Sequence, residues 1–120
     1  MKQMFLSTGK EFKEIETFEP GAWIHLVNPS QEEAMKVAER FDIGIQDLRA
    51  PLDVEETSRI DVEDDYTLIL VDVPTQEERN NKSYYVTIPL GIIVTDEVVV
   101  TTCLEDICLM DNFLNHRVRN

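Results

Sequence analysis

Residues 43–74 read IGIQDLRAPLDVEETSRIDVEDDYTLILVDVP, a stretch that combines a short helix, an acidic run and an apolar strand. The helix is expected at Ile45–Ala50, because its apolar residues fall on one side and Pro51 disfavours helical geometry in the residue before it. The strand is expected at Tyr66–Val73. Its first six residues, 66–71, are nearly all apolar on both faces, as is typical of a strand in the centre of a sheet. The remaining elements are expected to pack around this strand.

The acidic run between positions 53 and 65 carries seven carboxylates and one base. Alternation in Arg59–Glu63 predicts a half-exposed strand, with Ile60 and Val62 directed inward and the acids outward. The run contains no glycine of the kind a calcium-binding loop needs, so a solvated strand edge explains it better than a metal site. The charged residues are Asp53, Glu55, Glu56, Arg59, Asp61, Glu63, Asp64 and Asp65.

The composition is that of one soluble domain spanning residues 1–120. The chain has 24 acids and 11 bases, a formal net charge of −13, which repels nucleic acid and anionic lipid and attracts divalent cations or basic surfaces. Neither a signal peptide nor an apolar run of the ~18–20 residues that span a membrane is visible in the sequence.

The N-terminal part is expected to form strands at Gln3–Ser7, Phe12–Ile15 and Ala22–Val27. Alternation in the third strand separates Ile24 and Leu26 from Trp23 and His25, and a lone strand histidine is usually structural. A helix follows, capped either by Asn28 or by a capping box of Ser30 and Glu33. Its buried stripe is predicted at Ala34, Val37, Ala38 and Phe41.

The C-terminal part is expected to place a polar loop, Thr75–Lys82, at a hairpin tip, and to bend or bulge at Pro89. The flanking strands are predicted at Tyr84–Ile88, Leu90–Val94 and Val98–Cys103, and a helix from Asp106 onward. This order predicts an α+β fold with α/β/α layers, in which helices cover a mixed, largely antiparallel sheet of about six or seven strands.

Motifs for nucleotide binding or hydrolysis are absent from the sequence. Cys103 and Cys108 are expected to be reduced thiols, because His25 and His116 stand alone and complete no zinc-ligand spacing. Exposed carboxylates are poor general acids and bases, so no enzymatic activity is expected. The same acids would permit a hydrated magnesium ion, which needs only one or two protein carboxylates.

Four stretches resemble the cytoplasmic domain of CorA-type magnesium transporters. WIHL followed by NP and EE, within residues 23–33, resembles the start of that domain, and IQD at residues 45–47 resembles its short helix with an acidic pair. RIDVEDDY at residues 59–66 resembles the family's strand and turn R-P-K-V-E-x-Y-D-D-Y. Residues 90–95 and 98–102 resemble its I-I-L-T … L-I-T hairpin, so the resemblance covers essentially the whole chain in order.

The resemblance implies a site residue. Asp47 matches the family's sensing aspartate, which meets an acid on the stalk of the neighbouring subunit, with regulatory Mg²⁺ between them. Gln46 and His25 stand where the family often has acids, which leaves the choice among Mg²⁺, Co²⁺, Ni²⁺ and Zn²⁺ open. Without the stalk partner, Asp47 is expected to bind metal only weakly.

The implied function is that of a cytoplasmic, metal-sensing domain that regulates the gating of a CorA-like magnesium transporter. The parent protein would be a homo-oligomer, a pentamer at the cytoplasmic face of the cell membrane, and its stalk, pore helices and Gly-Met-Asn signature are not in this sequence. Direct contact with membrane or nucleic acid is not expected. The alternatives are a free-standing acidic binding or adaptor module with the same fold, and a small metal-dependent enzyme.

Overall fold

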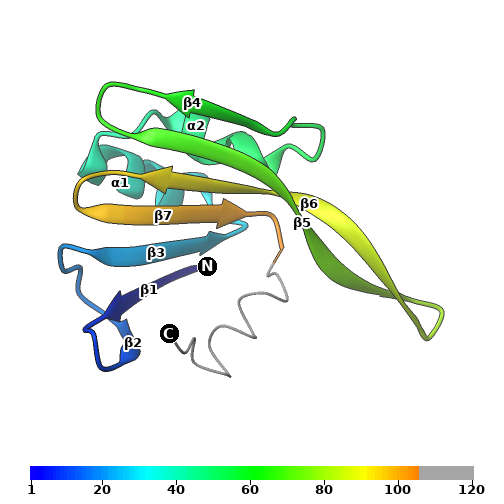
Figure 1. Cartoon of the computed structure of the whole chain (residues 1–120). Coiled ribbons are helices and arrows are strands. Elements are labelled where there is room, and N and C mark those ends of the chain that lie inside the picture. The colour runs from blue at the N-terminus through cyan, green and yellow to red at the C-terminus, as the bar shows by residue number, and fades with distance from the viewer. Residues whose placement is uncertain (106–120) are drawn as a thin grey trace.

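A seven-stranded sheet forms the centre of the molecule, in the order β2-β1-β3-β7-β6-β5-β4 (Figure 1). The computed structural model describes residues 1–105, without the side chains of residues 77–79. Neighbouring strands are antiparallel except β3 and β7, which are parallel, so the predicted mixed, largely antiparallel sheet is confirmed. The strands are β1 Lys2–Ser7, β2 Phe12–Ile15, β3 Ala22–Val27, β4 Arg59–Val62, β5 Thr67–Arg79, β6 Lys82–Val94 and β7 Val98–Cys103.

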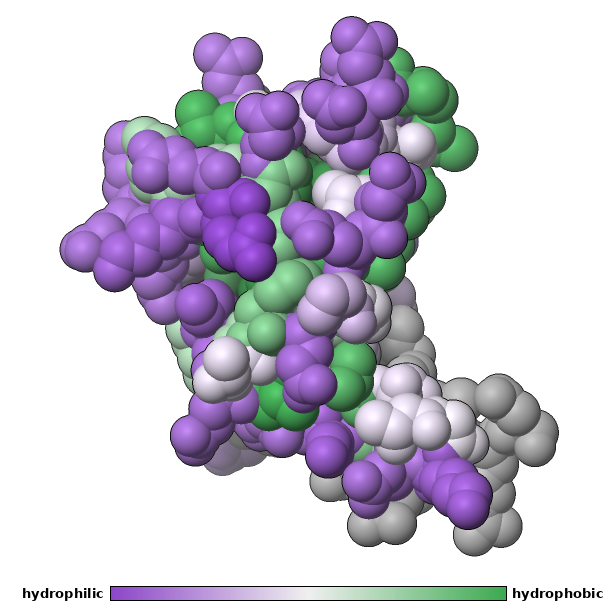
Figure 2. Space-filling model, turned by 90° about the vertical axis from the view of Figure 1, so that its left-hand side faces the viewer, coloured by the Kyte–Doolittle hydropathy of each residue, from purple (hydrophilic) through white to green (hydrophobic). Residues whose placement is uncertain are grey.

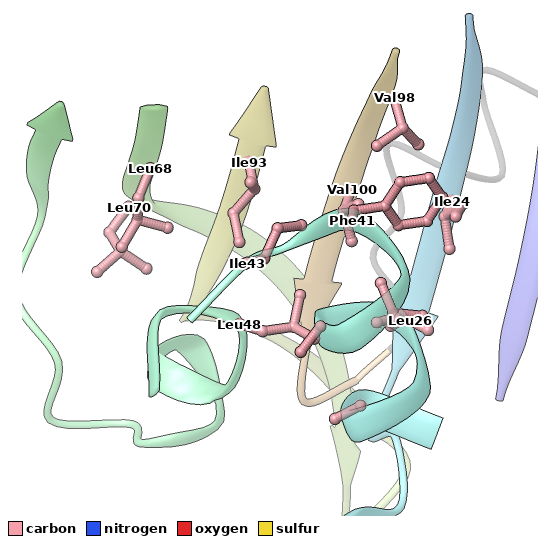
Figure 3. Close-up of a cluster of buried hydrophobic side chains, with 13 residues drawn as sticks. Ile24, Leu26, Phe41, Ile43, Leu48, Leu68, Leu70, Ile93, Val98 and Val100 are labelled. Carbon is pink, nitrogen blue, oxygen red and sulfur yellow. The ribbon is translucent and has the colours of Figure 1, made fainter. Parts of the chain in front are cut away.

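The helices α1 (Gln31–Phe41) and α2 (Ile45–Arg49) lie on one face of the sheet (Figure 1). Figure 3 shows the main core between them and the strands, with Phe41 and Leu48 directed from the helices toward Ile24 and Val100 on the sheet. Within residues 1–105, both helices pack on this one face. The helix predicted from Asp106, and with it the second helical layer, falls outside the described residues.

The start of α1 is fixed by the capping box rather than by Asn28. The Ser30 hydroxyl accepts the Glu33 backbone N–H at 3.1 Å, and the Glu33 carboxylate accepts the Ser30 N–H at 3.0 Å. The helix ends at Asp42, whose left-handed backbone (φ 56°) closes it. The buried residues are those of the predicted stripe: Ala34, Val37, Ala38 and Phe41.

Pro51 does not stop the helical path, contrary to the prediction. α2 ends at Arg49, but the chain continues as a 3₁₀ turn over Ala50–Leu52, and Ala50 keeps helical dihedrals (φ −52°, ψ −43°). The Pro51 ring is buried against Gly91 of β6, where an added Cβ would lie only 2.7 Å from its Cγ. This close packing offsets the local preference of the residue before proline.

The predicted orientation of β4 is wrong. Ile60 and Val62 are exposed (67% and 78%), while Arg59 and Asp61 lie on the half-buried side of the strand. The pairing of Ile60 with Ile69 sets this register and directs Ile60 and Val62 to the face away from the helices. Alternation identifies two faces of a strand but does not say which one an edge strand buries.

The polar segment 75–82 is not a loop but part of a long hairpin. β5 and β6 pair continuously from Thr67–Val94 to Arg79–Lys82, and only Asn80 and Asn81 form the turn, both with positive φ (52° and 64°). Positive φ at both central residues is typical of the two-residue turn whose twist matches the strands. The hairpin therefore projects beyond β4 and β7 (Figure 1).

Pro89 does not interrupt β6. It pairs with Asp72 of β5, one residue beyond the last pair between β6 and β7, Leu90 with Cys103. Within residues 1–105, no strand neighbour remains on the β7 side at this point, so a residue that lacks an N–H is tolerated there.

Candidate functional site

Asp47 lies in the first turn of α2 and is held by Tyr66, the residue that precedes β5. The Tyr66 hydroxyl donates to Asp47 Oδ2 at 2.5 Å and accepts the Gly44 backbone N–H at 3.2 Å. A Cβ at Gly44 would lie 3.1 Å from the Tyr66 hydroxyl, so glycine leaves room for this contact. Tyr66 is therefore the residue that links Asp47 to the chain segment before β5.

The Tyr66 hydroxyl remains protonated at neutral pH. Its burial and then its hydrogen bond to the Asp47 carboxylate raise the pKa of Tyr66 to about 12, against the opposing effect of the Gly44 N–H. Tyr66 is therefore a permanent donor to one oxygen of Asp47 under physiological conditions. A carboxylate has about four acceptor positions on its two oxygens, so Asp47 keeps acceptor capacity for a cation or another donor.

A shallow groove of about 540 Å³ lies beside Asp47. It carries charges of both signs, from Asp47, Asp53, Glu56, Arg49 and Arg59. The full lining is Gln31, Ile45, Gln46, Asp47, Arg49, Ala50, Asp53, Glu56 and Arg59.

Arg59 neutralises part of that groove. Its guanidinium donates to the Asp61 carboxylate at 2.7 Å and to the Glu56 carboxylate, and these hydrogen bonds raise the pKa of Arg59 above its usual value. Glu56 and Asp61 of the acidic run therefore both bind Arg59, the one base of that run. Asp47 is instead held by the neutral Tyr66 hydroxyl.

The described residues contain no group of three or more His, Cys, Asp or Glu side chains placed to hold a metal ion. Asp47 alone offers one or two oxygens, which suits a magnesium ion that keeps most of its waters. A tighter site would need a second carboxylate from another chain or segment.

The acidic run does not converge on Asp47. Glu63, Asp64 and Asp65 are exposed and, with Asp96, line a separate hollow of about 300 Å³ at the β4–β5 turn. Asp53 accepts the Glu55 N–H at 2.9 Å in a local turn. The structure thus agrees with the expectation of a solvated strand edge for this run.

His25 and Cys103 occupy structural positions. His25 is 1% exposed and its Nδ1 lies 2.7 Å from Thr101 Oγ1, which also accepts Trp23 Nε1–H at 2.7 Å. Cys103 is buried, with Sγ 4.0 Å from the Leu26 carbonyl oxygen. The expected thiol state of Cys108 concerns a residue outside the described part of the chain.

Sequence reasoning missed Tyr66 and Gly44 as partners of Asp47. The signal for Tyr66 was its place as the final tyrosine of the RIDVEDDY motif, which was interpreted only as the start of a strand. Gly44 gave no signal of its own in the sequence.

Comparison with known proteins places this fold in a family context. Residues 19–118 match the family model described as CorA-like Mg²⁺ transporter protein. The cobalt/magnesium transport protein CorA of Methanocaldococcus jannaschii is 30% identical over 79 residues, which are 66% of this chain and 23% of that protein. Among the described helices, none has the length and apolar content needed to cross a membrane.

Solved structures share the fold. The soluble domain of CorA from M. jannaschii aligns with a TM-score of 0.77 at 22% identity, over 96% of this chain and 45% of that one. The complete CorA magnesium transporter from M. jannaschii aligns with a TM-score of 0.72 at 18% identity, over 97% of this chain and 36% of that one. The full-length CmaX protein aligns with a TM-score of 0.67 at 10% identity, over 95% of this chain and 37% of that one. This chain thus spans less than half of each relative. The family-model match covers most of its length, and the chain belongs to the CorA-like Mg²⁺ transporter family.

Proposed function

We propose that this chain is the cytoplasmic regulatory domain of a CorA-like divalent cation transporter and that Asp47 provides one half of a regulatory Mg²⁺ site. The observation that carries the proposal is the Tyr66–Asp47 hydrogen bond, which fixes a half-buried carboxylate beside an open groove. Family membership and the transport functions named for its M. jannaschii relative support it.

The second half of the site would come from a neighbouring subunit of a homo-oligomer, a pentamer as the family resemblance implies. A hydrated Mg²⁺ between two carboxylates would hold adjacent subunits in one arrangement, and its loss would release them and favour an open pore. The net charge of −13 strengthens this coupling, because neighbouring copies repel one another when the cation is absent.

Oxygen donors also bear on the choice of ion. Asp47 offers only oxygen, which suits Mg²⁺, whereas Zn²⁺ prefers nitrogen and sulfur ligands. We therefore place Mg²⁺ first, followed by Co²⁺, which is named for the M. jannaschii relative, with Ni²⁺ and Zn²⁺ last. The role is regulatory rather than enzymatic.

The test is a Mg²⁺ titration of this chain and of a longer polypeptide that also contains the stalk segment. Protease protection and sedimentation would report the response. We expect added Mg²⁺ to increase protection and the sedimentation coefficient only in the longer polypeptide. This response should be lost on Asp47→Asn and kept on Asp53→Asn, because Asp53 lines the same groove without the tyrosine partner. An unchanged Mg²⁺ response in Asp47→Asn would remove the sensing role.

A further inference from the structure

The edge strand β4 exposes an apolar ridge. Ile60 and Val62 are 67% and 78% exposed, point to the same face and are followed directly by Glu63, Asp64 and Asp65. Figure 2 shows hydrophobic surface at its upper right, where the sheet face away from the helices meets the β4 end of the sheet. Exposed aliphatic side chains on an edge strand favour association with another chain.

A pocket of complementary character lies at the opposite end of the sheet, between α1 and β1. Its volume is about 430 Å³, within the range of ligand-binding pockets. The floor is apolar and consists of Met4, Phe18, Ile24, Val37 and Phe41. The remaining lining residues are Lys2, Lys36, Arg40, Glu16 and Thr17.

The basic rim of this pocket is ordered and accessible. The Arg40 guanidinium lies 5.2 Å from the Phe18 ring centroid and 5.0 Å from that of Phe41, which holds it over the apolar floor. Its ion pair with Glu97 (3.9 Å) and that of Lys36 with Glu32 (3.5 Å) are solvent-exposed, and such pairs are weak enough to exchange for a partner's carboxylates.

The charges at the rim of this pocket indicate what kind of segment could bind in it. The chain has 24 acids and 11 bases, yet this rim has three bases and one acid, so an acidic segment with large apolar side chains fits it. We propose that residues 60–65 of a second copy of this chain dock here. Ile60 and Val62 enter the apolar floor, and Glu63, Asp64 and Asp65 face Lys2, Lys36 and Arg40.

The contact is heterologous, because the pocket lies by β1 and the ridge on β4, at opposite ends of the sheet order. Repetition of such a contact builds a ring or an open chain rather than an isolated symmetric dimer. It also brings Asp47 to a subunit boundary, since Arg59 of β4 lines the Asp47 groove. The inference rests on the proposed homo-oligomer but not on the metal-binding role of Asp47.

Sedimentation velocity of this chain at low ionic strength tests the contact. We expect concentration-dependent assembly that weakens with added salt, and a loss of about tenfold or more in association on Val62→Asp or on the double change Lys2→Glu/Lys36→Glu. The matched controls are Val54→Asp, at another exposed valine, and Lys10→Glu/Lys82→Glu, at two other exposed lysines, and both should assemble like the unaltered chain.

A mixture of the two defective variants gives the decisive result. The Val62→Asp chain keeps its pocket and the lysine-altered chain keeps its ridge, so a heterologous contact predicts discrete one-to-one complexes that grow no further. A monomeric unaltered chain at all concentrations, or a mixture that forms no complex, would overturn the proposal. Both readings are made without Mg²⁺, so a failure here is distinct from a failure of the Asp47 site.

Discussion

At the scale of single residues, the Tyr66 hydroxyl determines how the Asp47 carboxylate is presented. α2 has only five residues, so its own backbone gives the side chain little support. The hydrogen bonds to Asp47 Oδ2 and from the Gly44 N–H tie the helix start to the residue that precedes β5. A carboxylate held in this way loses less conformational freedom when it binds any partner.

Removal of the Tyr66 hydroxyl should therefore loosen the helix start. We expect Tyr66→Phe to lower the free energy of unfolding by about 1 kcal/mol, because a charged acceptor loses its donor while remaining half-exposed to water. Urea unfolding of the variant and of Tyr84→Phe, an exposed control, would measure this. Equal stability of the two variants would mean that the hydrogen bond contributes nothing.

Because the pKa of Tyr66 is raised, the free energy of unfolding should depend on pH in the alkaline range. The folded value of about 12 lies above the ordinary value of 10.0, so the contribution is full below pH 10.0 and is lost as pH rises toward 12. In that window the unfolded chain releases a proton that the folded chain retains. The difference of about 1 kcal/mol in unfolding free energy between the unaltered chain and Tyr66→Phe should therefore disappear across this window. Parallel pH profiles for the two proteins would contradict this.

At the scale of elements, the sequence predicts what local periodicity controls. The buried stripe on α1 and the separation of Ile24 and Leu26 from Trp23 and His25 in β3 were both correctly predicted. The orientation of β4 and the continuation of β5 and β6 through polar residues depend on pairing between distant segments, which composition does not reveal. The asparagine pair at the tip was the available signal for the longer hairpin.

The contact between Pro51 and Gly91 is another such long-range effect and can be tested directly. Gly91→Ala should destabilise the protein by about 1–3 kcal/mol, because its Cβ would lie 2.7 Å from Pro51 Cγ in a buried contact. In a Pro51→Ala background the same change should cost much less, so urea unfolding of the double-mutant cycle should show a strong coupling. Additive effects of the two changes would show that the close approach is not what constrains Gly91.

At the scale of the whole molecule, the candidate site was predictable only in part. Asp47 was identified through motif order, since one aspartate on a short helix has no signal of its own. In the acidic run, Glu56 and Asp61 bind Arg59, whereas Glu63, Asp64 and Asp65 lie at the β4–β5 turn. This arrangement depends on how the chain bends, and the number of charges in the sequence does not predict it. The same holds for the basic pocket, whose lysines and arginine come from different elements.

The excess of acids is a property of the whole surface, and its effect is sharpest at the β4–β5 turn. Glu63, Asp64 and Asp65 share a hollow with Asp96, and like charges so placed repel one another. We expect Asp64→Asn/Asp65→Asn to raise the free energy of unfolding by about 0.2–0.5 kcal/mol at low ionic strength and to lose that gain in concentrated salt, where exposed charges are screened. Urea unfolding at two salt concentrations would measure this, with Glu11→Gln/Glu14→Gln at the other end of the sheet as the control. A gain that persists in concentrated salt would show that the turn limits stability through its backbone rather than through its charge.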